Sequence, residues 1–245
     1  MKRQYMHRFN RYFYTSIALL WGVSIACAEY VIVNSSDGSF TLEAGSFDGF
    51  LANQENQFAM SDQEILASTL NNDGIDTVGK LSFVLASTDA GLSFMGLFDG
   101  IPTTNPTGSF ADQFLGISST TSIDTSWFAT GDEGSEYSWY DLGNETQLVN
   151  ALLGWDHEQT SAGFAWGDVR TAQTGTVNLY DVDLSEFASD SIQFVTYQDD
   201  HWAVAGTADF SVLGQYAFSY QYVPAPGAIA LFALVGLTSN RRRRK

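Results

Sequence analysis

The chain has almost no cysteine, with a single residue, Cys27, among 245. Cys27 lies in an N-terminal segment that we expect to be removed, as described below. The remaining chain then has no disulfide bond and no thiolate for zinc binding or nucleophilic catalysis. Its stability must come from a hydrophobic core, and residues 29–222 are enough to bury one.

Basic residues are also scarce in the middle of the chain. All 28 acidic residues lie from Glu29 to Asp209, whereas only Lys80 and Arg170 of the 11 basic residues lie there. Two cations against 28 carboxylates give this part a net charge of −26. Such a surface repels nucleic acid and anionic lipids, so neither is an expected partner. Adaptation to an ionic medium explains the charge more simply than specific cation binding.

A basic segment, an apolar segment and a small-residue motif follow one another at the N-terminus. They predict a secretory signal peptide over residues 1–28, to be removed by signal peptidase. Ala26 and Ala28 supply the small residues of the cleavage site, and Glu29 follows the cut. Lipidation of Cys27 is the alternative, but it needs an aliphatic residue at the position of Ser24.

The last 23 residues divide into a proline pair, an apolar run and a basic cluster. Pro224 and Pro226 lack amide donors and separate the tail from the preceding strand. Residues 227–237 carry no charge, and as a helix they would measure roughly 16 Å. This is about half of a ~30 Å hydrocarbon core. We therefore expect transient anchoring in the inner membrane, with residues 241–245 on the cytoplasmic side.

The tail resembles the PEP-CTERM sorting signal of Gram-negative bacteria. The matching residues are Val223, Pro224, Ala225, Pro226, Gly236, Leu237, Arg241, Arg242, Arg243 and Arg244. Ala225 stands where the family usually has Glu, and tails beginning V-P-A-P-G-A look like a recurring subtype. The resemblance implies processing by an exosortase-type enzyme and delivery to the cell surface or extracellular matrix. The family as a whole is associated with exopolysaccharide and biofilm.

Residues 29–222 show the periodicity of strands, which predicts one all-β domain, a β-sandwich or jelly roll. Residues 80–86 and 91–98 flank a turn and predict a hairpin. A capping box at residues 61–64 predicts a short helix over 65–70. Residues 146–155 fit a helix or a strand, and we favour a strand. Further strands are expected over 29–34, 39–43, 114–119, 126–129, 137–140, 163–167, 176–182, 191–197, 202–205, 208–213 and 216–223.

No catalytic signature stands out, and we expect no enzyme and no catalytic residues. His157 and His201 each follow an aspartate and suit polar turns better than a triad. Two isolated histidines without cysteine do not make a zinc site. The many carboxylates leave a glycosidase open as an alternative, but no pair stands out among them.

Calcium is the one cofactor that the residue pattern suggests. Asn71, Asp73 and Asp76 place side-chain oxygens around a glycine, which partly matches calcium loops. The terminal glutamate of the twelve-residue pattern is missing. An ordinary Asn-Asp-Gly turn is therefore the favoured interpretation.

Aromatic residues allow a carbohydrate-binding module as another alternative. Most tryptophans of a sandwich lie in its core. Trp139 and Tyr140 are the expected exception, because neighbouring strand residues face opposite ways and one should point outward. The favoured function is still a non-catalytic protein of the cell surface or matrix, with extracellular polysaccharide as a candidate partner.

Overall fold

The fold is described by a computed structural model for residues 29–49, 51, 59–99, 113–130, 136–155, 161–182, 187 and 190–225. The chain divides into two compact units, of which Glu29–Pro224 is one. Met1–Ala28 and Ala225–Lys245 form the other, and of these only Ala225 is among the described residues. The expected signal peptide and apolar tail helix therefore lie outside the described residues. Within the described residues, no helix is long and apolar enough to cross a membrane.

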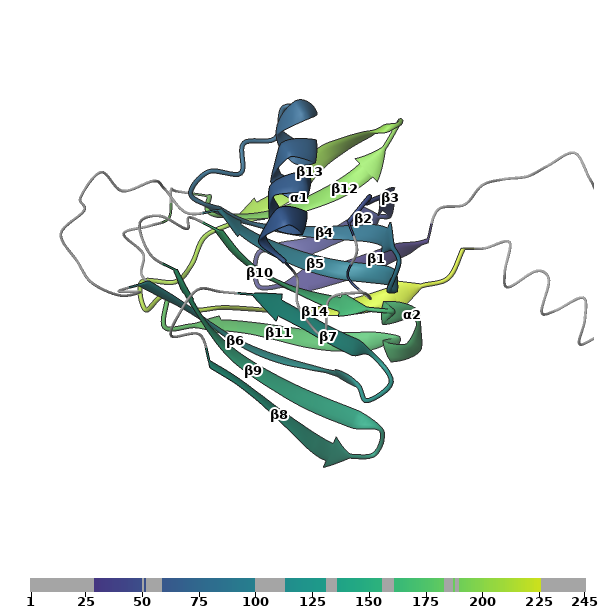
Figure 1. Cartoon of the computed structure of the whole chain (residues 1–245), viewed down its shortest axis with the longest axis vertical. Coiled ribbons are helices and arrows are strands. Elements are labelled where there is room, and N and C mark those ends of the chain that lie inside the picture. The colour runs from purple at the N-terminus through teal and green to yellow at the C-terminus, as the bar shows by residue number, and fades with distance from the viewer. Residues whose placement is uncertain are drawn as a thin grey trace, which may run out of the picture. The chain divides into compact units, whose positions relative to one another are not determined.

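We call the unit Glu29–Pro224 the body. Two β-sheets form it, which confirms the predicted all-β sandwich-like fold (Figure 1). Sheet A is antiparallel throughout, whereas sheet B contains parallel pairs on one side of β4. In spatial order, sheet A is β2 (Gly38–Glu43), β1 (Tyr30–Ser35), β14 (Tyr216–Val223), β11 (Thr174–Tyr180), β6 (Gln113–Ser122), β9 (Thr146–Trp155) and β8 (Glu136–Gly143). Sheet B is β13 (His201–Ala208), β12 (Ile192–Gln198), β4 (Lys80–Thr88), β5 (Gly91–Asp99), β10 (Ser161–Gly167) and β7 (Ser126–Thr130), with β3 (Gly45–Ser46) beside β4.

The main hydrophobic core contains buried side chains from both sheets. Phe83 of sheet B meets Phe218 of sheet A edge to face, with ring centroids 4.7 Å apart. Phe94 stacks on Tyr220 of sheet A at 5.0 Å. These ring pairs require Phe218 and Tyr220 to face inward, in keeping with the alternating burial along β14.

Helix α1 (Met60–Asn72) adds a third layer by covering the other face of sheet B. Its Leu66 and Leu70 are fully buried in a second cluster with Val84 and Met95. Strands β4 and β5 are therefore apolar on both faces, which explains their nearly continuous hydrophobic sequence. The helix predicted over residues 65–70 is confirmed as part of α1, but the prediction that residues 61–64 form a capping box is wrong. Ala59 is the N-cap, and no side chain caps the helix.

Most predicted strands are present, including the hairpin of β4 and β5 and the strand over residues 146–155. The strand expected over residues 208–213 is wrong beyond Ala208. Ser211 Oγ accepts the amide protons of Leu213 and Gln215, and Gly214 has a φ of +65°. These hydrogen bonds form a turn in place of the expected pairing with a neighbouring strand. Helix α2 (Val169–Ala172) was not predicted.

Candidate functional site

On the outer face of sheet A, the central strands β6, β11 and β14 carry mostly small polar side chains. Val177 and Leu179 of β11 are buried in the core, so the alternate residues Thr176 and Asn178 face outward. Thr120 of β6 pairs with Thr176 in the strand register. At the centre of sheet A, β11 thus carries its apolar side chains on one face and hydroxyl and amide groups on the other.

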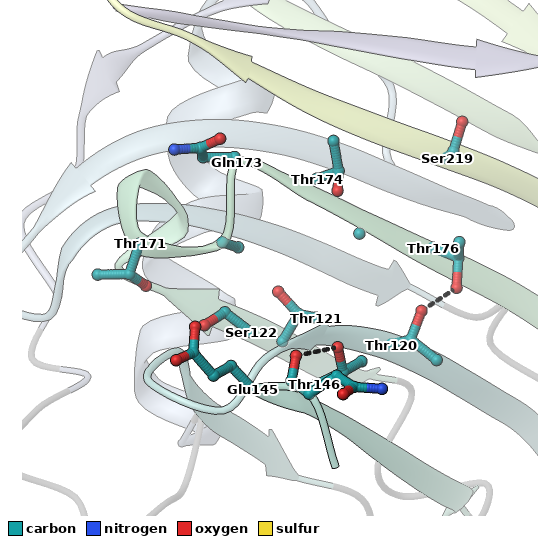
Figure 2. Close-up of a pocket in the computed structure, with 13 residues that line it drawn as sticks. Thr120, Thr121, Ser122, Glu145, Thr146, Thr171, Gln173, Thr174, Thr176 and Ser219 are labelled. Atoms are coloured by element: carbon teal, nitrogen blue, oxygen red, sulfur yellow. Dashed lines mark hydrogen bonds between the residues drawn. The ribbon is translucent and has the colours of Figure 1, made fainter. Parts of the chain in front are cut away.

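A hollow of about 570 Å³ lies at one end of this face, near helix α2 and the β8–β9 turn. Figure 2 shows Gln173 on one side of Ser122 and Glu145 on the other. Thr120 and Thr176 are hydrogen-bonded to each other across 2.6 Å (Figure 2). The side chains of Gln173, Thr174 and Ser219 line the same hollow without a hydrogen bond to another described residue. They are free to bind water or a polar ligand.

A second hollow, of about 720 Å³, lies further along β11 and β14, which also line the first hollow. Asn178 and Tyr180 line it from β11, Ala217 lines it from β14, and Gln215 lies just before β14. Since Thr174 and Thr176 line the first hollow, outward residues of β11 run from one hollow into the other. We call the two hollows together the trough. From Thr174 to Tyr180 it extends ~20 Å at about 3.3 Å per strand residue.

Tyr180 lies at the far end of the trough, with its ring against Gly116. A Cβ atom built on Gly116 would come within 2.5 Å of Cε2 of Tyr180. The absence of a side chain at Gly116 thus lets the ring lie close to the sheet. Partial burial of the Tyr180 hydroxyl raises its pKa, and the nearby Asp181 carboxylate adds to the effect. Tyr180 is therefore neutral at physiological pH.

Charge is sparse in the trough although the body is strongly acidic. Of the described residues that line the first hollow, Glu145 alone is charged. Asp37 and Asp209 line the second hollow, and neither lies on a strand. Among the described residues, no lysine or arginine lines either hollow. The floor of the trough is made of uncharged groups.

The predicted sugar-stacking residues Trp139 and Tyr140 lie on edge strand β8, outside both hollows. Trp139 pairs with the buried Val149, so it lies on the core side of the sheet. Tyr140 lies on the outer side. Both are about half exposed, at 55% and 51%, because an edge strand is open on either face. Trp139 Nε1 donates to Gln147 Oε1 across 2.5 Å.

The calcium candidates Asn71, Asp73 and Asp76 lie in the turn that ends α1, where Gly74 has a φ of +85°. Asp73 Oδ2 accepts the Trp202 amide proton at 2.7 Å, and Asp76 Oδ1 accepts that of Val78 at 3.2 Å. These bonds give the carboxylates structural partners. In the described part of the chain, no three His, Cys, Asp or Glu side chains come together as a metal site.

Of the two histidines considered for catalysis, His201 is described. It is exposed at the start of β13, and its Nδ1 lies 3.1 Å from the carbonyl oxygen of Asp199. Asp199 and Asp200 both have positive φ values and form the β12–β13 turn, whereas His201, which was expected in a polar turn, is the first residue of β13. His157 lies outside the described residues.

The ends of the body lie next to each other in sheet A, since Tyr30 pairs with Val223. Arg170 Nε donates to both oxygens of Asp168, at 2.8 and 3.0 Å, and Arg170 Nη1 lies 3.7 Å from Glu29 Oε2. The hydrogen bond to Asp168 is the main reason that the pKa of Arg170 is raised.

The structure describes four of the predicted processing residues, namely Glu29, Val223, Pro224 and Ala225. Ala26, Ala28, Pro226, Gly236, Leu237, Arg241, Arg242, Arg243 and Arg244 lie outside the described residues.

The fold and the trough define an all-β sandwich with an open polar face on the central strands of sheet A. No protein-family model, curated protein or solved structure matches the chain.

Sequence reasoning missed the trough. The alternation in residues 174–180, where Thr, Thr and Asn alternate with Gly, Val and Leu, was the available signal. It identifies one polar strand face, whereas the hollow needs α2 and the β8–β9 turn beside that face.

Proposed function

We propose that the protein is an exported, non-catalytic protein of the cell surface or extracellular matrix. Two predicted processing sites support this role, one before Glu29 and one at residues 223–226. The compact unit Glu29–Pro224 ends close to both sites. Removal of the two flanking segments would thus leave the sandwich whole.

The pairing of Tyr30 with Val223 is the observation that carries the proposal. It places both ends of the body on neighbouring strands, so signal peptidase and an exosortase-type enzyme would each act on a segment next to the folded domain. The net charge of −26 adds support, because a strongly charged body stays soluble outside the cell.

Surface display on intact cells tests this role. Antibodies against the body should bind intact cells that produce the full chain. Replacing Arg241, Arg242, Arg243 and Arg244 with serine should leave the protein in the inner membrane and out of reach of the antibody. Lys80→Ser is the control, because it removes a cation from the body and leaves the tail intact. Equal display of all three proteins would refute the proposal.

A further inference from the structure

We propose that the trough on the outer face of sheet A binds a neutral polysaccharide chain, with Tyr180 as a stacking platform. The inference deepens the proposed surface role by naming a ligand class and a site. It depends on the groups that line the trough and on the shape of the face, and it can be tested with purified protein.

The lining of the trough matches a ligand rich in hydroxyl groups. Thr174 and Ser219 offer hydroxyls that donate and accept, and Gln173 offers an amide that does the same. The side-chain groups of these three residues form no hydrogen bond to another described residue. Sugar hydroxyls also donate and accept, so each group can be satisfied on binding.

Charge selects a neutral chain over an acidic one. The body carries −26, and the described residues of the trough include no lysine or arginine to bind carboxylate, sulfate or phosphate groups. An anionic polysaccharide would be repelled at long range and would find no ion pair at the site. A neutral one meets neither obstacle.

The extended shape favours a polymer over a small molecule. The two hollows follow one another along β11 and β14, from Thr174 to Tyr180 and from Ser219 to Ala217. Each alone has the size of a small-molecule site, which is usually about 300–1,000 Å³. Together they present repeated polar groups over ~20 Å of strand.

Tyr180 supplies the apolar contact that such a chain needs. Its ring lies against Gly116 and is only partly buried. The apolar face of a sugar ring can stack on such an aromatic surface, and the hydroxyls at its edge can reach Asn178 of the same strand.

Affinity electrophoresis of the purified full chain tests this. Gels contain hydroxyethyl cellulose, galactomannan or laminarin as neutral probes, or alginate as the anionic one. We expect retardation in at least one neutral gel and none in alginate. Tyr180→Ala should need at least tenfold more polysaccharide for the same retardation, whereas Tyr180→Phe should behave like the parent protein.

Two further variants keep the test decisive. Ala217→Arg places a bulky side chain on the outward face of β14, inside the second hollow, and should also abolish retardation. It covers the case in which Tyr180→Ala fails to fold. Trp139→Ala alters an exposed aromatic residue outside the trough and should bind normally.

Three results would overturn the proposal: no retardation in any neutral gel, stronger retardation in alginate, or loss of binding in Trp139→Ala with normal binding in Tyr180→Ala. None of them bears on where the cell places the protein. The surface role and the polysaccharide site therefore fail separately.

Discussion

Tyr222 donates its hydroxyl proton to Oε1 of Glu29 across 2.9 Å, joining the last strand to the first residue of the body. Arg170 approaches the other oxygen of the same carboxylate. One of the two cations in the body thus lies where its ends meet. This arrangement accounts for an arginine in a part of the chain that otherwise avoids basic residues.

Arg170→Ala should lower the free energy of unfolding by about 0.2–1 kcal/mol, because partly exposed ion pairs contribute little. The loss should shrink in 1 M salt, which screens the charges. Arg170→Lys should restore part of the stability. Urea unfolding at two salt concentrations measures this. A loss that is the same at both would show that the contribution is not electrostatic.

Ser119→Ala should cost about 1–3 kcal/mol, because it leaves a buried donor without a partner. Ser119 Oγ accepts the indole proton of Trp166 at 2.7 Å and donates to the carbonyl of Thr176 at 2.6 Å. Ser118→Ala is the matched control on the opposite face of the same strand, where a change within about 0.5 kcal/mol is expected. Urea unfolding monitored by tryptophan fluorescence compares the two. Similar losses would show that the hydrogen bonds of Ser119 do not matter.

Gly175→Ala should destabilise the protein by about 1–3 kcal/mol through overpacking. A Cβ atom at Gly175 would overlap the ring of Tyr220, which is buried in the core. The double variant with Tyr220→Leu should lose less than the two single changes together, because the clash is relieved. A double-mutant cycle from thermal unfolding checks this. Simple additivity would mean that the ring and the glycine are not coupled.

Stability should fall between pH 10 and 12. Burial raises the pKa of Tyr216 to about 12 from its usual 10, and burial together with the bond to Glu29 raises that of Tyr222 to about 12. Burial also raises the pKa of Tyr220. Since the unfolded chain ionises first, these groups contribute their full stability below pH 10 and lose it as pH rises through the folded pKa.

Thermal unfolding from pH 8 to 12 measures this alkaline loss, and Tyr220→Phe supplies the comparison. The variant should be about 0.5–1.5 kcal/mol less stable at pH 8, because the bond from Tyr220 to Thr121 is gone. It should then lose less stability than the parent between pH 10 and 12. A parent protein with unchanged stability up to pH 12 would contradict the argument.

The local pattern of the sequence was enough to predict much of the fold. Alternation in residues 216–223 indicates which side chains face the core, and the β4–β5 hairpin follows from its turn. The sequence could not show that β8 is an edge strand, because strand order depends on distant pairings. Both Trp139 and Tyr140 are therefore exposed, where alternation alone predicted one.

The trough was beyond sequence reasoning for the same reason. Thr120, Thr176 and Ser219 lie far apart in the chain and meet only through the order of β6, β11 and β14. Serine and threonine on a strand also look alike whether they face bulk water or a hollow. By contrast, the two ends of the chain carry local signals that need no tertiary structure to be recognised.

Mass spectrometry of the protein isolated from the surface of its own cells tests the central claim most directly. We predict a product that begins at Glu29 and ends near residues 223–226, without the basic cluster at 241–245. Intact surface protein that retains residues 1–28 or the arginine cluster would contradict the account.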